Sequence, residues 1–321
     1  MNESRLNDLT YSLFDPTGNI TALVDSEVAV EEQPAVADLI MRKHPEVEQV
    51  GFVTFPGGGG HGAGGGGAHM SGGGHGAADG EAQRIDGELR MAGGEFCGNA
   101  SMCAAALCLI RQRETAASDD NASGRIRVRV SGAADPVDVR LKALSDVSFT
   151  ARVTMPPCLS IENRNFAAGD VTGDLPVVRM EGISHVIIGE TSEFFSLRSE
   201  APAAEDAVRK WCRELEADGL GLMFLESTAI RETCGRNEDG AATATLTPLV
   251  YIPGSGTVFW ENSCASGSAA AGMYLAAQAA GEATFGPDSV TAVFREPGGT
   301  LRVESGKAGT CLTGTVRLIK D

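Results

Sequence analysis

The chain is poor in basic residues and has no long apolar run. Its 321 residues include 26 Lys and Arg against 43 Asp and Glu, a net charge of −17. Nucleic acids and anionic membranes are bound largely through Lys and Arg, so this balance argues against both partners. No run of 18 or more apolar residues occurs, so no membrane span is expected. The first eight residues carry acids where a secretory signal would be basic, and we expect a cytoplasmic protein.

The cysteines also lack the spacings that mark metal sites. The chain has eight of them, but none forms a Cys-x-x-Cys pair, and no Cys and His spacing matches a zinc site. In a cytoplasmic protein these thiols are expected to stay reduced. The sequence therefore predicts no disulfide framework and no metal, and several cysteines are expected to be small buried hydrophobes.

Residues 57–78 form an insert rich in glycine and histidine. Thirteen of the twenty residues 57–76 are Gly, interrupted by His61, His69 and His75. Such a run cannot build a packed core and behaves as a flexible coil. A metal-binding or lid loop is the alternative interpretation, but three histidines at these spacings define no coordination geometry. We interpret the insert as a loop between two strands.

Two segments of the chain share one pattern: a strand, a turn, a cysteine and a helix of small residues. The first leads through Cys97 into a helix over residues 98–113. The second leads through Cys264, 167 positions later, into a helix that ends near Gly281. The first helix is apolar on every face over residues 102–110, which is typical of a helix that is buried all round.

This repeat predicts an α/β (α+β) fold of two pseudo-symmetric halves. Each half is expected to be a mixed β-sheet or barrel wrapped around a central buried helix, with the functional site in the cleft between them. Residues 1–148, with the insert 57–78 and the returning C-terminal strands 300–321, are assigned to the first half, and residues 149–299 to the second.

A cysteine at a helix N-terminus has chemical consequences. The helix end carries partial positive charge and unpaired N–H groups, which favour a thiolate and bind anions such as a carboxylate. Two such ends that face each other would hold one carboxylate between them, with a thiolate and a thiol on either side of the adjacent carbon. One sulfur would remove a proton and the other would return one from the opposite face. Cys97 and Cys264 are therefore the predicted catalytic pair.

These motifs resemble the diaminopimelate epimerase-like family of racemases, which work without pyridoxal phosphate. The family carries Cys-Gly-Asn in its first half and Cys-Gly-Ser/Thr-Gly in its second, and here the stretches are Cys97-Gly-Asn-Ala and Cys264-Ala-Ser-Gly. The resemblance implies the diaminopimelate epimerase-like fold, no cofactor, an amino-acid substrate and a homodimer. It also implies that backbone N–H groups bind the substrate carboxylate, namely those of Gly98, Asn99, Ala265 and Ser266.

Two further residues are carried over from the family pattern. Gly18-Asn19 matches an early Gly-Asn whose asparagine contacts substrate, so Asn19 is a candidate substrate-binding residue. Ser184-His185-Val matches an Asn-Pro-His stretch, although Ile183 stands at the asparagine position. His185 is therefore a candidate helper of the catalytic pair, and a buried structural histidine is the alternative.

The departures from the family bear on the substrate. Diaminopimelate epimerases have a Glu-Arg-Gly stretch before the second cysteine, and its arginine helps to bind the distal end of the substrate. The corresponding stretch here, Val250-Tyr-Ile-Pro-Gly, has no arginine. The sequence around the two cysteines resembles the histidine racemases of opine-type metallophore synthesis more closely. Glu95 and Glu261 are candidates to face a basic or imidazole side chain, or else are carboxylates placed at helix starts.

The best interpretation is thus a cofactor-independent amino-acid racemase, with histidine as the expected substrate. A diaminopimelate epimerase with an altered distal pocket and a non-catalytic amino-acid-binding relative stay open as alternatives. A proline-type racemase or hydroxyproline epimerase fits less well, because the second motif differs from theirs. A metal-handling protein that uses the Gly/His insert is a further class.

Overall fold

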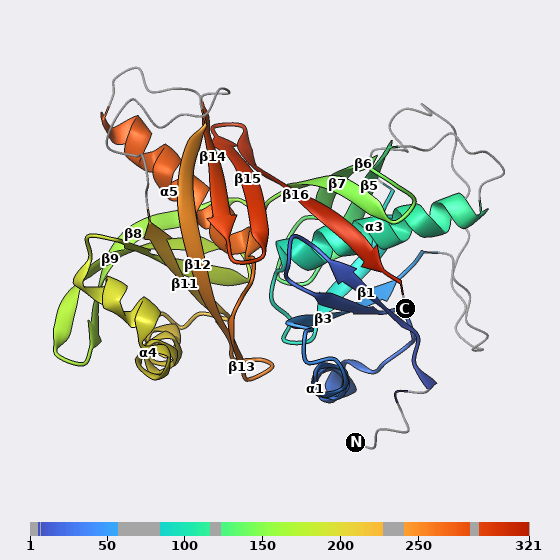
Figure 1. Ribbon diagram of the computed structural model, residues 1–321, viewed down its shortest axis with the longest axis horizontal. Helices are drawn as coiled ribbons and strands as arrows, with labels where there is room; N and C mark the ends of the chain where they lie inside the picture. Colours follow the sequence, from blue (N-terminus) through green and yellow to red (C-terminus); the bar gives the residue numbers. More distant parts are fainter. Residues whose placement is uncertain are drawn as a thin grey trace, which may run out of the picture.

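The computed structural model describes residues 6, 8–56, 84–115, 123–226, 241–282 and 289–320. Over these ranges sixteen strands form one continuous hydrogen-bonded sheet, which curls around two helices (Figure 1). The Gly/His insert 57–78 and Cys234 lie outside the described residues. Among the helices described, none has both the length and the apolar character needed to cross a membrane.

The first half of the sheet closes into an eight-stranded barrel. Its strands follow in the order β1 (Tyr11–Asp15), β2 (Thr21–Val24), β3 (Gln49–Thr54), β4 (Gly87–Met91), β5 (Ser123–Val130), β6 (Val137–Ala143), β7 (Ser148–Thr154) and β16 (Gly309–Ile319). The last strand pairs with both β7 and β1, which closes the ring. Helix α3 (Gly98–Thr115) fills the barrel, and its residues are buried continuously from Gly98 to Leu109. The expected helix that is buried all round is confirmed.

The second half is an open sheet that wraps around the second helix. After β16 the strands continue as β15 (Gly299–Gly306), β14 (Ser289–Glu296), β12 (Ala242–Ile252), β11 (Leu220–Glu226), β10 (Ile183–Gly189), β9 (Val171–Met180) and β8 (Cys158–Ala168). Short β13 (Thr257–Trp260) pairs with β12. Helix α5 (Ala265–Glu282) packs against both arms of this sheet and is buried from Ala265 to Met273. A mixed sheet curled around a central helix is therefore confirmed in each half.

Two further helices cover the outer faces. Helix α1 (Gln33–Lys43) packs on β3 and buries Val36, Leu39 and Ile40 beside the barrel. Helix α4 (Ala201–Glu214), preceded by the 3-10 helix η3 (Glu193–Ser199), covers β11 and β12 with Trp211 fully buried. A shorter 3-10 helix, η2 (Val30–Glu32), leads into α1.

The two halves share one strand. Strand β16 pairs with β7 of the barrel on one side and with β15 of the open sheet on the other. Strand β7 begins at Ser148 and belongs to the barrel, while β15 also pairs with β14. The division of the chain into domains at residues 148 and 299 stays a prediction.

Candidate active site

The N-termini of α3 and α5 meet at the centre of the molecule. Cys97 directly precedes α3, and Cys264 directly precedes α5. A Cβ built on Gly98, the first residue of α3, would lie only 2.8 Å from the Cβ of Ala265, the first residue of α5. The helix ends are therefore in contact, and the approach requires a residue without a side chain at position 98.

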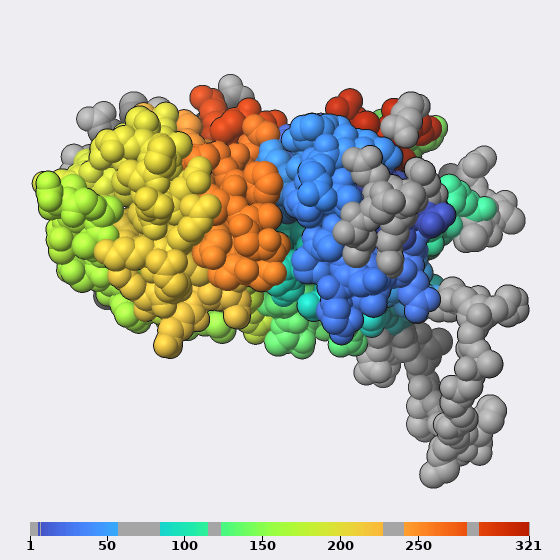
Figure 2. Space-filling model, turned by 90° about the horizontal axis from the view of Figure 1, so that it is seen from below, coloured from blue at the N-terminus to red at the C-terminus, as the bar shows by residue number. Residues whose placement is uncertain are grey.

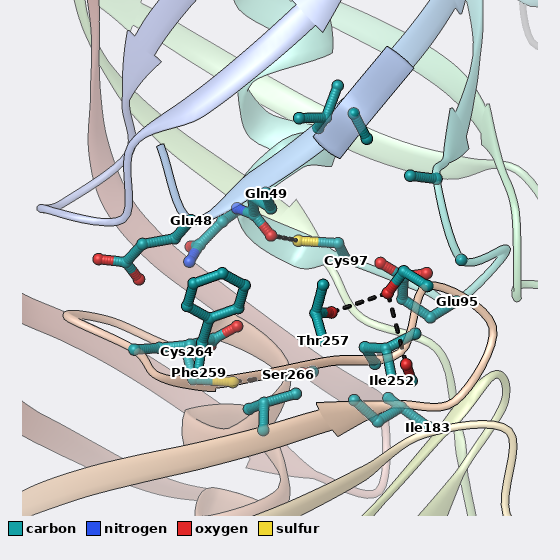
Figure 3. Close-up of a pocket in the computed structure, with 18 of the residues that line it drawn as sticks. Glu48, Gln49, Glu95, Cys97, Ile183, Ile252, Thr257, Phe259, Cys264 and Ser266 are labelled. Carbon is teal, nitrogen blue, oxygen red and sulfur yellow. Dashed lines mark hydrogen bonds between the residues drawn. The ribbon is translucent and has the colours of Figure 1, made fainter. Parts of the chain in front are cut away.

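A cavity of about 170 Å³ opens beside these helix ends, between the two halves. Both cysteines line it, and Figure 3 shows them on opposite walls with Phe259 and Thr257 of β13 between them. Helix α1 also contributes to the lining, and Figure 2 shows the seam where the blue N-terminal region meets the orange segment around β13. The size suits one small molecule, and the lining comes from both halves.

Cys97 is half-buried, and its sulfur has two partners. The thiol donates a hydrogen bond to Gln49 Oε1 at 2.8 Å, and the sulfur accepts one from the Ala100 N–H in the first turn of α3 at 3.4 Å. Burial raises the pKa of this thiol strongly, the Ala100 N–H opposes that shift, and the carboxylates of Glu261 and Glu95 add to it.

Cys264 is more deeply buried, with 4% of its surface exposed. Its sulfur accepts the Gly267 N–H at 3.4 Å and lies 3.6 Å from Ser266 Oγ. Burial raises the pKa of Cys264 well above its usual value, and the carboxylates of Glu261 and Glu296 raise it further. The expectation that the helix ends lower the thiol pKa values is thus wrong for the net shift, because burial outweighs the helix N–H groups at both cysteines.

The four predicted carboxylate-binding positions lie together at the helix ends. Gly98, Asn99, Ala265 and Ser266 all line the cavity, and they belong to the first turns of α3 and α5. N–H groups in a first helical turn have no partner within the helix, so they are available to an anion. Their role in binding a substrate stays a prediction.

Asn19 occupies a different place from the other candidates. It is fully buried and is not among the residues that line the cavity. Its side-chain amide donates to the carbonyl of Ser263 at 2.7 Å, and the Asn99 amide donates to the same carbonyl at 2.9 Å. Both asparagines therefore fix the segment that leads into Cys264, and the predicted contact of Asn19 with substrate stays untested.

His185 reaches Cys264 through Ser266. Its Nε2 lies 3.1 Å from Ser266 Oγ, which in turn lies 3.6 Å from the Cys264 sulfur. The ring is fully buried, which lowers the pKa of His185 to about 3, so it is neutral at physiological pH. Its Nδ1 finds no hydrogen-bond partner among the described residues. This position is consistent with the predicted supporting role.

Three glutamates line the cavity, and among the described lining residues none is Lys or Arg. Burial and neighbouring carboxylates raise the pKa of Glu261 to about 8, and the nearby Cys264 thiol opposes that shift. Burial raises the pKa of Glu95, whose Oε2 has no hydrogen-bond partner among the described residues. Glu48 accepts hydrogen bonds from the backbone and side chain of Asn262, and so ties the two halves together.

Sequence reasoning missed three residues that shape this site. Glu48 directly precedes β3, Gln49 is the first residue of that strand, and Glu296 is the last residue of β14. Gln49 contacts Cys97, Glu48 anchors Asn262, and Glu296 accepts the Cys264 N–H at 2.6 Å. Their only sequence signal is a polar residue at the end of an apolar strand, which is too common to single them out.

The described residues offer no ready metal centre. No group of three or more His, Cys, Asp or Glu side chains is placed to hold an ion in the parts of the chain that the structure describes. The seven cysteines within those ranges are all free. The three histidines of the insert lie outside them.

Known proteins resemble the chain over most of its length. A histidine racemase of Fusobacterium nucleatum subsp. nucleatum is 28% identical over 278 residues, which cover 85% of this chain and 83% of that protein. A histidine racemase of Staphylococcus aureus is 26% identical over 276 residues, which cover 83% of this chain and 79% of that protein.

Solved structures share the fold at low sequence identity. A hydroxyproline epimerase from Agrobacterium vitis with bound trans-4-hydroxy-L-proline has a TM-score of 0.57 at 12% identity, covering 98% of this chain and 93% of that one. A probable proline racemase from Agrobacterium radiobacter K84 has a TM-score of 0.56 at 12% identity, covering 98% and 92%. This likeness confirms the expected fold.

The family itself is shown by a match to the sequence. Residues 77–316 match the family described as the histidine racemase CntK N-terminal domain, which is most of the chain and includes both cysteines. The resemblance inferred from the two cysteine motifs is confirmed. The chain therefore belongs to this family and is an isomerase of the racemase and epimerase class.

Proposed function

We propose that the chain racemises histidine by a two-thiol mechanism without pyridoxal phosphate. The observation that carries this proposal is the placement of Cys97 and Cys264 on opposite walls of one small cavity, each at the N-terminus of a buried helix. The activity named for the relatives from Fusobacterium nucleatum and Staphylococcus aureus supports histidine as the substrate.

In this proposal the touching helix ends bind the α-carboxylate. Gly98, Asn99, Ala265 and Ser266 all line the cavity, and their N–H groups belong to the first turns of the two helices. Loss of the α-proton moves negative charge onto the carboxylate oxygens, and fixed N–H donors stabilise that charge as an oxyanion hole does. Closure of the two halves around a bound substrate would exclude water and strengthen the same interactions.

The thiols then exchange one proton for another across the α-carbon. One sulfur, as thiolate, takes the α-proton and becomes a thiol, while the C–H electron pair passes to the carboxylate as an enolate. The opposite thiol donates its proton to the other face and becomes a thiolate, and the reverse reaction exchanges the roles. The N–H groups of Ala100 and Gly267 contact the two sulfurs and favour the thiolate that the base requires, against the burial that raises both thiol pKa values.

The acidic wall of the cavity favours an imidazole over a second carboxylate. Glu95 and Glu261 present acceptors to the cavity, and Glu95 Oε2 has no hydrogen-bond partner within the described ranges. An imidazole N–H satisfies such an acceptor. The distal carboxylate of diaminopimelate would instead meet this acidic wall without the arginine that it pairs with in true epimerases.

The first experiment follows the α-proton. Reduced protein without added pyridoxal phosphate is incubated in D2O with L-histidine, and separately with LL-diaminopimelate and a pool of other amino acids. We expect loss of the histidine α-proton signal in NMR and formation of D-histidine in chiral chromatography. Inversion of diaminopimelate in preference to histidine would establish the epimerase alternative. Absence of exchange with every amino acid, in folded protein with free thiols, would favour the non-catalytic binder.

Substitution of the two cavity glutamates tests whether either of them contacts the side chain of the substrate. Replacement of Glu95 or Glu261 by glutamine removes the ionisable carboxyl group but keeps the shape, and we expect KM for histidine to rise about 10-fold for the residue that contacts imidazole. Glu261→Gln also changes a partner of Cys264, so its kcat is expected to fall as well. Glu304→Gln, at a half-buried position of β15 that does not line the cavity, is the control. Equal KM values in all three variants would contradict a role for either glutamate.

A further inference from the structure

Glu296 is a buried carboxyl group beside the second cysteine that the proposed reaction does not use. It is the last residue of β14, has 7% of its surface exposed and does not line the cavity. Its Oε2 accepts the Cys264 N–H at 2.6 Å, and its Oε1 accepts the hydroxyl of Ser268. One carboxyl group thus holds both the residue before α5 and a residue in its first turn.

This arrangement breaks the symmetry between the two halves. Both cysteines are followed four positions later by a fully buried serine, Ser101 in α3 and Ser268 in α5. Ser101 donates its hydroxyl hydrogen bond to the carbonyl of Cys97 at 2.6 Å, within its own helix. Ser268, at the matching position, donates to Glu296 on a separate strand. The start of α5 is therefore anchored to the sheet by a carboxyl group on β14, whereas the serine at the start of α3 bonds only to the residue four positions before it.

The two thiols also differ in the ionisable groups that surround them. Cys97 donates to the neutral amide of Gln49, whereas Cys264 lies among Glu261, Glu296 and the His185–Ser266 pair. The pKa of Glu296 is raised to about 8 by burial, while the hydrogen bonds from Ser268 and Cys264 oppose that shift. A thiol with a pKa above its usual value titrates where Glu296 is already ionised, so the two negative charges oppose each other there.

We propose that Glu296 is a positioning residue for Cys264: its carboxyl group fixes the first turn of α5 and sets the charge beside the thiol. This inference rests on the proposed acid–base role of Cys264. Glu296 then has two effects, the hydrogen bonds that hold the start of α5 and the negative charge that it carries when ionised. A neutral side chain of the same shape would keep the hydrogen bonds and remove only the charge.

The test separates the anchor from the charge with two variants of the full chain. Glu296→Gln keeps an acceptor for the Cys264 N–H, and its amide NH2 donates to Ser268 Oγ. Glu296→Ala removes both bonds. We expect kcat/KM to fall about 10- to 100-fold in Glu296→Ala, which loses both hydrogen bonds of the buried carboxyl group, and to recover most of this loss in Glu296→Gln. Glu304→Gln again serves as the control.

The decisive readout is the pH dependence of alkylation, followed separately for each cysteine by peptide mass spectrometry with iodoacetamide. In Glu296→Gln the midpoint for Cys264 is expected to fall by about one pH unit, because a like charge has been removed, while that for Cys97 stays in place. An unchanged Cys264 midpoint, or an equal shift at both cysteines, would overturn the proposal. Alkylation is measured without substrate turnover, so the result does not depend on which amino acid is the substrate. The measurement uses only Glu296→Gln, so it can be made even if Glu296→Ala fails to fold.

Discussion

Replacement of either Cys97 or Cys264 by serine is expected to abolish measurable racemisation, with a loss in kcat/KM of about 10²–10⁴-fold. A hydroxyl is a much weaker acid than a thiol, so serine is a poor proton donor and its conjugate base is not populated near neutral pH. A positioned general acid or base contributes about this factor. Both losses are expected to be of similar size, because each direction of the reaction uses one sulfur as base and the other as acid.

A matched control separates this chemistry from the general effect of removing a thiol. Cys158 on β8 is exposed and does not line the cavity, and Cys158→Ser is expected to keep wild-type turnover. Thermal unfolding of each variant checks that the serine is tolerated, since Cys264 is buried. If Cys97→Ser or Cys264→Ser, correctly folded, racemised histidine at the wild-type rate, the two-thiol mechanism would be refuted.

Isotope placement gives a second, independent test of the pair. If two separate sulfurs act on opposite faces, early turnover in D2O places deuterium in the D-histidine formed and leaves the remaining L-histidine unlabelled. A single base that serves both faces would return deuterium to the substrate as well as to the product. Labelling of both enantiomers at equal initial rates would therefore favour a one-base reaction.

The parts of the structure that were predictable from the sequence are those with a local signal. Helix α3 is apolar on every face, and that pattern alone predicts burial all round. The repeated strand, cysteine and small-residue helix predicts that Cys97 and Cys264 play equivalent roles, and the structure places both on one cavity. Strand β8 is not predicted by the sequence. It lies at the edge of the sheet with most of its side chains exposed, so it lacks the alternation of apolar residues that marks a half-buried strand.

What the sequence did not predict depends on contacts between distant positions. Gln49 meets Cys97 across 48 positions, and Glu296 meets Cys264 across 32, only because the strands that carry them lie beside the helix ends. The direction of the thiol pKa shifts could not be predicted from the sequence either. A helix N-terminus is visible in a sequence, whereas the burial that outweighs it follows from how the two halves pack.

The contact between the two helix ends makes the second large prediction. Gly98→Ala would place a methyl group 2.8 Å from the Cβ of Ala265 and 3.2 Å from Met155 Cε. Met155 has a flexible side chain, but Ala265 moves only if α5 moves. Since carbon atoms pack at about 3.5–4.0 Å, the helix ends must separate by roughly 1 Å. A displacement of this size at a catalytic site lowers the rate by about 10²-fold, so we expect that loss in kcat/KM.

Transfer of the methyl group from one helix to the other tests whether spacing is the cause. Ala265→Gly alone removes a contact without creating a clash, and we expect it to retain most activity. The double variant Gly98→Ala/Ala265→Gly restores the space between the helices and is expected to recover most of the loss, as measured by histidine turnover. If it stayed as inactive as Gly98→Ala, glycine would be needed at position 98 for another reason, such as access of the carboxylate to its N–H. Recovery would instead show that the distance between the two helix N-termini is itself a determinant of the reaction, because both sulfurs are fixed at those ends.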